Sequence, residues 1–132
     1  FGYELDITRI REEDKRQIPG QIQLYHKYSS LMLTGDYYRI SSWTDRKPLD
    51  CWEAAAKDGS HALVTCVQVL GRPNVKSTLI KVRGLKADAL YRLEGTEEAY
   101  TGEELMECGF LIRDLNGDFK SRLYHFVCEE MA

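Results

Sequence analysis

The stretch HALVTCVQVL, residues 61–70, contains the longest apolar run in the chain. Apolar side chains fall at both odd and even positions in it, so both faces of a strand built from it would be largely apolar. Such a strand lies in the middle of a sheet and is covered on both sides. Because the run is far too short to span a bilayer, it predicts a central strand of a folded domain.

Short runs rich in β-branched and aromatic residues surround this stretch, all of them beyond residue 35. Turn sequences such as Asp58-Gly59 and Asn116-Gly117 separate them. With the central run included, the expected strands cover residues 36–40, 51–57, 60–70, 77–83, 89–94, 110–115 and 119–128. Seven strands at this spacing predict an antiparallel β-sandwich of the Greek-key type. One short helix is expected among them, because Thr101 and Glu104 form a capping box and Gly109 can end the turn.

The segment before residue 35 has a different period. Apolar residues recur there at spacings of three and four, which predicts an amphipathic helix over residues 12–33; they are Ile18, Ile22, Tyr25, Tyr28 or Ser29, and Met32. Pro19-Gly20 predicts a break or kink, with the stronger helix starting at Pro19, because proline lacks an N–H and clashes with the preceding turn. Gly35 is well placed to cap the helix. The expected fold class is therefore mainly β, a sandwich preceded by an N-terminal α-helical segment.

Composition and charge limit the possible classes of protein. The chain has 132 residues, 43% hydrophobic and 11% aromatic, which is enough for one soluble domain with a core. Its net charge of −3, without any block of like charge, argues against nucleic acid or a membrane as partner. The cysteines are scattered, with no Cys-x-x-Cys pair, at Cys51, Cys66, Cys108 and Cys128. We expect reduced, buried thiols and a cytoplasmic location, with a disulfide between two of them as the alternative.

No metal or cofactor site is expected. DLNGD, residues 114–118, resembles the start of a calcium loop, but Phe119 and His125 occupy the places of the glycine and glutamate that such a loop needs. A type I′ hairpin turn at Asn116-Gly117 is the better interpretation. His125 and Cys128 lie three residues apart, so on a strand they would point to opposite faces.

The chain shows no catalytic constellation of its own. His26 and His61 are isolated, and no Ser-His-Asp order, nucleophile elbow or phosphate-binding glycine loop is present. The expected set of catalytic residues is therefore empty.

The aromatic residues suggest binding instead. Trp43 and Trp52, with Tyr37, Tyr38 and Tyr100, would suit a stacking platform for a sugar ring, although packing in the core and at strand edges is the more ordinary use of such residues. Trp43, in the polar stretch SSWTDRKP, is expected to be the most exposed of the set. Trp43 and Trp52 are the candidate substrate-binding residues.

Several ordered motifs carry a family resemblance. They are FGYELD (1–6), QIQLYHKYSSLMLTGDYYRI (21–40), WEAAAKDGSHALVTCVQVLGRPN (52–74), VRGLKADALYRLEG (82–95), AYTGEELMECG (99–109) and GDFKSRLYHFV (117–127). Together they resemble the C-terminal end of glycoside hydrolase family 36, the α-galactosidases, over almost the whole chain. The most specific pieces are FGYELD, the stretch from Tyr100 to Gly109, and DFKSRLYH.

The resemblance implies an architecture and a mechanism. Family members have a catalytic (β/α)8 barrel followed by an antiparallel β-sandwich. Residues 1–35 would be the end of the last barrel strand and the last barrel helix, and residues 36–132 the C-terminal domain, so we expect a tail fragment. The family retains anomeric configuration with two aspartates on earlier barrel strands. Glu4 and Asp6 are then structural or, at most, near the rim of the site.

The resemblance also implies a role. We expect a non-catalytic C-terminal domain that caps and stabilises the barrel of an α-galactosidase acting on melibiose and raffinose-type oligosaccharides. The rest of that glycosidase is the expected partner, and this fragment alone is expected to be inactive. Two alternatives remain, a carbohydrate-binding module with a galactoside ligand and an oligomerisation surface that makes a homo-oligomer. The apolar stripe of the helix is expected to fold onto the sandwich or to pair with a second copy.

Overall fold

The computed structural model describes residues 2–45, 47, 49–74 and 77–129 of the chain. In sequence order the elements are α1 (Glu12–Thr34), β1 (Asp36–Ser41), η1 (Trp43–Asp45), β2 (Asp50–Ala55), β3 (His61–Gln68), β4 (Thr78–Ile80), β5 (Leu90–Leu93), β6 (Ala99–Thr101), η2 (Glu104–Cys108), β7 (Phe110–Ile112) and β8 (Lys120–Glu129). None of the helices in the described ranges has the length and apolar character needed to cross a membrane.

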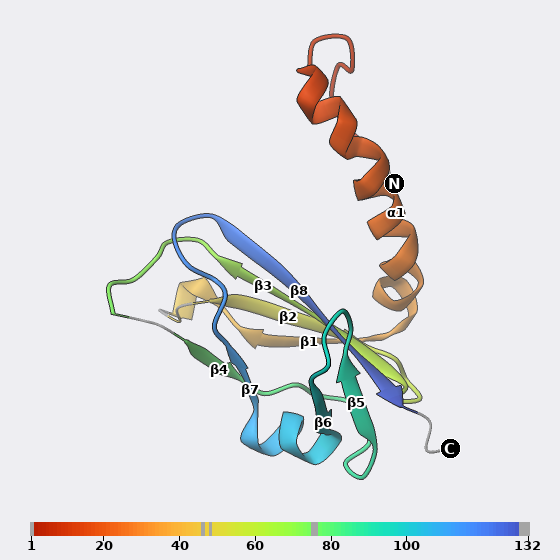
Figure 1. The fold of residues 1–132 in the computed structure, drawn as a ribbon, viewed down its shortest axis with the longest axis vertical. Coiled ribbons are helices and arrows are strands. Elements are labelled where there is room, and N and C mark those ends of the chain that lie inside the picture. Colours follow the sequence, from red (N-terminus) through yellow and green to blue (C-terminus); the bar gives the residue numbers. More distant parts are fainter. Residues whose placement is uncertain (1, 46, 48, 75–76, 130–132) are drawn as a thin grey trace.

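The strands form two antiparallel sheets that pack face to face, as Figure 1 shows. The larger sheet has six strands in the order β1-β2-β3-β8-β5-β6, and the smaller one pairs β4 with β7. The predicted central strand is confirmed, because β3 lies between β2 and β8 and pairs along its whole length with the distant β8. The fold is the expected antiparallel β-sandwich preceded by a helix.

The core lies between the two sheets. Phe110 of β7 packs edge-on against Tyr124 and Phe126 of β8, at ring-centroid distances of 5.1 and 5.2 Å, and so ties the small sheet to the large one. Tyr91 is completely buried, and its hydroxyl donates to the carbonyl of Gly59 at 2.6 Å. The buried hydroxyl of Tyr91 therefore has a hydrogen-bond partner in the core.

A break at Pro19-Gly20 is wrong, because α1 continues through both residues to Thr34, and a kink there stays a prediction. A proline removes one backbone hydrogen bond, and the turns on either side of Pro19 retain theirs. The acidic residues of the first turn, Glu12, Glu13 and Asp14, also stabilise the helix by interacting with the positive end of its dipole.

Gly35 ends α1 as predicted, although its backbone is extended and not left-handed. Its N–H donates to the carbonyl of Leu31 at 2.8 Å. A Cβ at this position would lie 2.6 Å from the carbonyl oxygen of Ala55. The glycine is therefore required by the close approach of β2.

Other local predictions have mixed outcomes. The capping box is confirmed, because the Glu104 carboxylate accepts from the Thr101 N–H at 2.7 Å and the Glu104 N–H donates to the Thr101 hydroxyl at 3.1 Å. The type I′ hairpin at Asn116-Gly117 is wrong, because β7 and β8 belong to different sheets and Gly117, but not Asn116, has a positive φ. The strand β6 was not predicted.

The cysteine prediction holds in part. All four thiols are free, and Cys51 and Cys66 are fully buried. Cys108 is exposed at the end of η2 and Cys128 is half-buried, so burial was wrongly expected for Cys108.

Among the described residues, helix α1 packs against the sandwich through its last turns (Figure 1). Tyr28 and Leu31 are buried there against Leu63 of β3. The expectation that the helix folds onto the sandwich is thus confirmed for this end. Met32, assigned to the stripe in place of Leu31, is 50% exposed.

Candidate functional site

The two tryptophans predicted to bind substrate are both half-buried. Trp43 lies in η1, and the guanidinium of Arg72 is 5.8 Å from the centroid of its ring. Trp52 lies in β2, and the guanidinium of Arg39 on β1 is 5.9 Å from its ring. A cation over each ring is a favourable arrangement, and it occupies one face that a sugar would use. Sugar binding by these residues stays a prediction.

The other three aromatic residues do not join them in one platform. Tyr37 is 62% exposed on β1, so the expectation that Trp43 is the most exposed of the set is wrong. Tyr38 alternates with Tyr37 and packs against the core. Tyr100 also packs inward, edge-on to Phe110 at 5.8 Å. The polar sequence around Trp43 did not reveal that Arg72 covers its ring.

A row of side chains crosses the face of the large sheet that is turned away from the core. Trp52 of β2 is opposite Thr65 of β3, and Thr65 is opposite Leu123 of β8. Their neighbours Cys51, Val64 and Tyr124 belong to the core, so these three point outward. Leu123 is 39% exposed and Trp52 and Thr65 are half-buried, so the described residues leave this part of the face uncovered.

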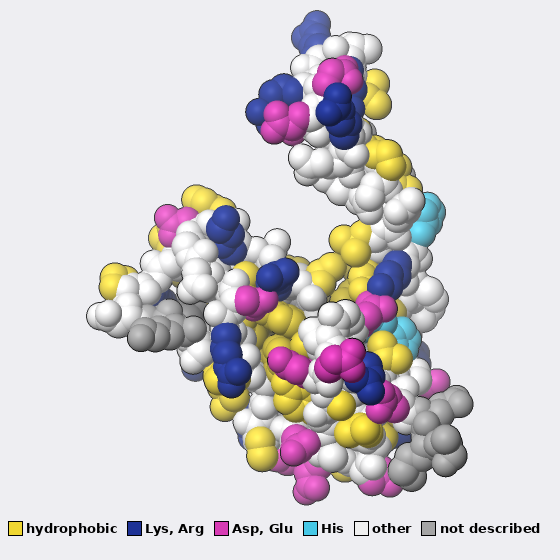
Figure 2. All heavy atoms as spheres, in the orientation of Figure 1, with side chains coloured by type: hydrophobic (Ala, Val, Ile, Leu, Met, Phe, Trp, Pro, Cys, Tyr) yellow, Lys and Arg dark blue, Asp and Glu magenta, His cyan; other side chains and the backbone are white. Residues whose placement is uncertain are grey.

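The stripe of α1 continues beyond its contact with the sheet. Leu24 lies four residues before Tyr28 and seven before Leu31, on the same side of the helix. Tyr28 and Leu31 are buried, whereas Leu24 is 46% exposed because the helix projects away from the sandwich. Figure 2 shows hydrophobic side chains in the corner where the helix meets the sheet. We call Leu24, Trp52, Thr65 and Leu123 the open face.

A polar network fixes the helix to the sheet beside this face. The carboxylate of Glu94 accepts from the ammonium of Lys27 at 2.6 Å and from the hydroxyl of Tyr28 at 3.1 Å, both on α1. It also lies 3.2 Å from Nδ1 of His125, whose Nε2 is 3.0 Å from Nδ1 of His61. The hydrogen bond from Lys27, helped by those from His125 and Tyr28, lowers the pKa of Glu94 to about 2. Burial lowers the pKa of His125, which favours a neutral ring.

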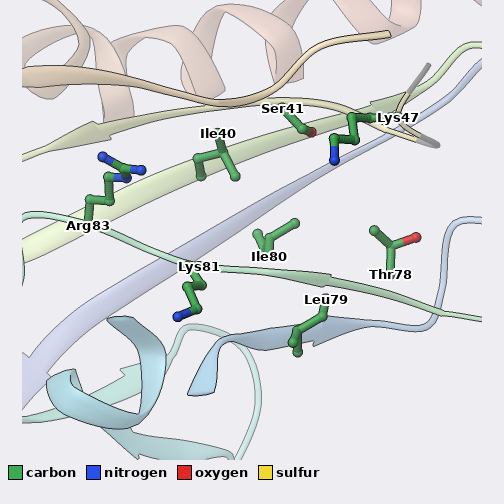
Figure 3. A pocket seen from close by; sticks show the side chains of 8 residues that line it. All are labelled: Ile40, Ser41, Lys47, Thr78, Leu79, Ile80, Lys81 and Arg83. Carbon is green, nitrogen blue, oxygen red and sulfur yellow. The ribbon is translucent and has the colours of Figure 1, made fainter. Parts of the chain in front are cut away.

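A pocket of about 290 Å³ lies between β1 and the small sheet. It is lined by Ile40, Ser41, Lys47, Thr78, Leu79, Ile80, Lys81 and Arg83. In Figure 3, Ile40 from β1 and Ile80 from β4 face each other across it. The mixture of aliphatic and cationic side chains suits a small solute better than a sugar, because no aromatic ring lines it.

The carboxylates near the start of the chain have structural partners. Asp6 accepts from the N–H of Thr8 at 3.0 Å and forms an ion pair with Arg9 at 3.2 Å. Glu4 is exposed. The structural role predicted for Asp6 fits this turn.

One buried carboxyl was not among the residues predicted from the sequence. Glu53 on β2 has no exposed surface, and burial raises its pKa to about 8. Its Oε2 accepts from the N–H of Arg83 at 2.9 Å, and its Oε1 has no partner among the described residues. A group without solvent contact cannot reach a substrate, so the raised pKa concerns stability. The stretch DCWEAA alternates in a way that places Glu53 inward, and this was the available signal.

The carboxylates of DLNGD, the stretch that resembles a calcium loop, have partners within the protein. Asp114 is bound by the Tyr124 hydroxyl and forms an ion pair with Arg122 at 2.8 Å. Asp118 accepts from the N–H of Gly71 at 2.7 Å. Within the described part of the chain, no three His, Cys, Asp or Glu side chains are grouped to hold a metal ion.

Comparison with known sequences gives consistent similarities. Residues 49–126 match the family model described as the glycosyl hydrolase family 36 C-terminal domain. The bifunctional α-galactosidase/sucrose kinase AgaSK of Mediterraneibacter gnavus is 33% identical over 132 residues, which is 99% of this chain and 14% of that protein. The α-galactosidase Mel36A of Lactobacillus acidophilus is 33% identical over 126 residues, 96% of this chain and 17% of its own length. The chain therefore spans about a sixth of the curated relatives it matches.

Solved structures give the same result in three dimensions. The galactosidase domain of AgaSK superimposes with a TM-score of 0.88 at 31% identity, over 98% of this chain and 18% of that one. An AgaA variant from Geobacillus stearothermophilus, solved in complex with raffinose, superimposes with a TM-score of 0.87 at 30% identity, again over 98% and 18%.

Proposed function

This chain belongs to glycosyl hydrolase family 36, in which it forms the C-terminal part, and we propose that it is a non-catalytic domain that caps and stabilises the catalytic barrel of a retaining α-galactosidase. Residues 1–35 would complete the barrel, and residues 36–132 would form the domain that docks on it. The substrates would be terminal α-galactosides such as melibiose and raffinose-type oligosaccharides. Relatives named α-galactosidases and a related structure holding raffinose support this substrate class.

The open face is the observation that carries the proposal. Leu24 on α1 and Leu123 on β8 leave apolar surface uncovered where the helix stands away from the sheet. Removing apolar surface of this kind from water lowers the free energy, so a second surface that covers it stabilises the molecule. The barrel of the same enzyme is a partner present at high effective concentration, since a covalent connection holds it nearby.

The proposed division at residue 35 is supported by the position of helix α1. Helix α1 lies outside the space between the two sheets, and its N-terminal part extends beyond the sandwich (Figure 1). The sheet begins at Asp36, directly after Gly35. In this proposal, one end of the helix packs on the sandwich and the rest packs on the catalytic barrel.

A truncation with complementation tests the capping role. The enzyme that carries this chain is made without residues 36–132, and those residues are supplied separately. We expect the truncated enzyme to lose thermal stability and turnover of melibiose, and the added domain to restore part of both. A truncated enzyme with unchanged unfolding temperature and kcat/KM would contradict the proposal.

A carbohydrate-binding module is the second candidate, because Trp52 lies on an uncovered part of the sheet. Binding of a galactoside there would require Arg39 to leave the ring or the sugar to use its other edge. Titration of the chain with galactose, melibiose and raffinose, followed by amide NMR shifts, tests it. Saturable shifts at Trp52 or Trp43 that Trp52→Ala or Trp43→Ala abolishes would support a module, and unchanged spectra at millimolar sugar would reject it.

A further inference from the structure

Two thiols meet in the centre of the large sheet. Cys51 on β2 is directly opposite Cys66 on β3, and their Sγ atoms are 3.0 Å apart. Both residues have no exposed surface. Directly opposed side chains of an antiparallel pair have Cβ atoms about 4.5–5.5 Å apart, and a disulfide takes about 3.5–4.5 Å. Only a small approach of the two strands separates this pair from bonding geometry.

The two sulfurs are chemically unequal. The hydrogen bond between the two thiols lowers the pKa of Cys51, and the side chain of Ser41 contributes in the same direction. The same hydrogen bond and burial raise the pKa of Cys66. Cys51 is therefore the sulfur that becomes a thiolate first, and the thiolate is the reactive form.

The strand that pairs with Cys51 on its other side borders a pocket. Ser41 is its partner across β1 and β2, next to a register shift between Arg39 and Ser41. Strand β1 is an edge strand, and Ile40 and Ser41 line the pocket of about 290 Å³ in Figure 3. Edge strands with irregular pairing open more readily than central ones. A small uncharged hydroperoxide fits that pocket.

We propose that Cys51 and Cys66 are a modification site, a dithiol that hydrogen peroxide converts into a disulfide linking β2 to β3. The Cys51 thiolate attacks one peroxide oxygen, so that an S–O bond forms, the O–O bond breaks, and the leaving hydroxide takes a proton to become water. The Cys66 sulfur then attacks the sulfenic sulfur of Cys51. The S–S bond forms, the S–O bond breaks, and the second hydroxide takes the Cys66 proton. Two thiols lose two electrons and two protons, and the peroxide becomes two waters.

Peptide mapping tests this in the full-length protein that carries the chain. The protein is treated with hydrogen peroxide, its free thiols are alkylated in denaturant, and it is digested with trypsin. Cleavage after Lys57 separates the two cysteines into peptides 47–57 and 58–76. We expect these two peptides to be recovered as one disulfide-linked species after oxidation, and as two alkylated peptides after subsequent reduction with dithiothreitol.

The controls use the cysteines that the structure separates from this pair. Cys108→Ser and Cys128→Ser should each leave the linked species unchanged, because Cys108 lies in η2 and Cys128 on β8 is paired with Tyr91 of β5. Recovery of Cys51 and Cys66 as separately alkylated peptides, at peroxide doses that fully oxidise the exposed Cys108, would overturn the proposal. So would linkage of Cys51 to any other cysteine. Because the readout is a peptide linkage and not turnover, it is independent of the proposed capping role.

Discussion

Ionisation of the buried carboxyl of Glu53 opposes the fold. Its pKa is about 8 in the folded chain and about 4.5 when solvated, so between these values the folded state holds a proton that the unfolded state releases. The free energy of unfolding therefore falls as pH rises from about 4.5 to about 8. Over that window the loss amounts to a few kcal/mol, at roughly 1.4 kcal/mol per pH unit.

Glu53→Gln removes this dependence. The amide oxygen can still accept from the Arg83 N–H, and no charge is buried at high pH. We expect the variant to match the original chain at pH 4.5 and to be roughly 4 kcal/mol more stable at pH 8. Urea unfolding across this range measures the difference. The exposed Glu4→Gln is the matched control, and two parallel stability curves for Glu53→Gln and the original chain would contradict the assignment.

Gly102 and Gly20 give opposite expectations for the same substitution. A Cβ at Gly102 would lie 2.0 Å from the carbonyl oxygen of Lys86, so Gly102→Ala must displace backbone and should destabilise the chain by at least about 2 kcal/mol. A Cβ at Gly20 would meet nothing within 4 Å, so Gly20→Ala should stabilise α1 by about 1 kcal/mol. Thermal unfolding of both variants measures the pair. Equal effects would mean that the close approach at Gly102 is relaxed in solution.

Individual residues were the hardest to predict from sequence. The exposure of Tyr37 and the cover of Trp43 by Arg72 depend on side chains from other strands and loops. The capping box at Thr101 and Glu104 was correct because all of its hydrogen bonds are local. The 3.0 Å approach of Cys51 and Cys66 required the register of β2 on β3, which scattered positions in a sequence do not reveal.

At the scale of elements, the strands and the helix with a clear hydrophobic periodicity could be predicted from the sequence. The central run became β3, and most other strands fall where their alternation ends in turn residues. Strands β4 and β7 are shorter than predicted, because their pairing with each other fixes only three residues on each. Strand β6 went unpredicted because TEEAYT, residues 96–101, has no alternation of its own, and it forms by pairing with β5.

Helix α1 depends on Leu31 for its attachment to the sandwich. The side chain is 6% exposed and packs with Tyr28 against Leu63. Leu31→Ala should therefore destabilise the chain by about 2–3 kcal/mol and release the last turns of α1. Amide hydrogen exchange of residues 28–34 measures the release. The matched control is Leu33→Ala, since Leu33 is 78% exposed, and faster exchange in both variants alike would contradict this contact as the cause.

At the scale of the whole molecule, exposed apolar residues on the two sides of the sandwich are expected to have different roles. Leu24 and Leu123 belong to the open face, whereas Leu79 is exposed on the small sheet at the opposite side of the core. If the open face docks on a catalytic barrel, a charge placed there must be buried without a partner, and a charge at Leu79 stays in water. The helix and the sandwich could each be predicted from the sequence. The angle between them could not, and this angle decides which surfaces remain uncovered.

Paired substitutions in the full-length enzyme test that distinction. Leu24→Asp and Leu123→Asp should each lower the unfolding temperature and the yield of active enzyme, because each leaves a carboxylate at the interface or separates the domains, at a free-energy loss of about 2–4 kcal/mol. Leu79→Asp should change neither by more than about 0.5 kcal/mol. In the chain alone, all three variants should be nearly equal in stability, since all three positions are exposed there. Equal behaviour of the three variants in the full-length enzyme as well would place the barrel contact elsewhere and remove the open face from the capping proposal.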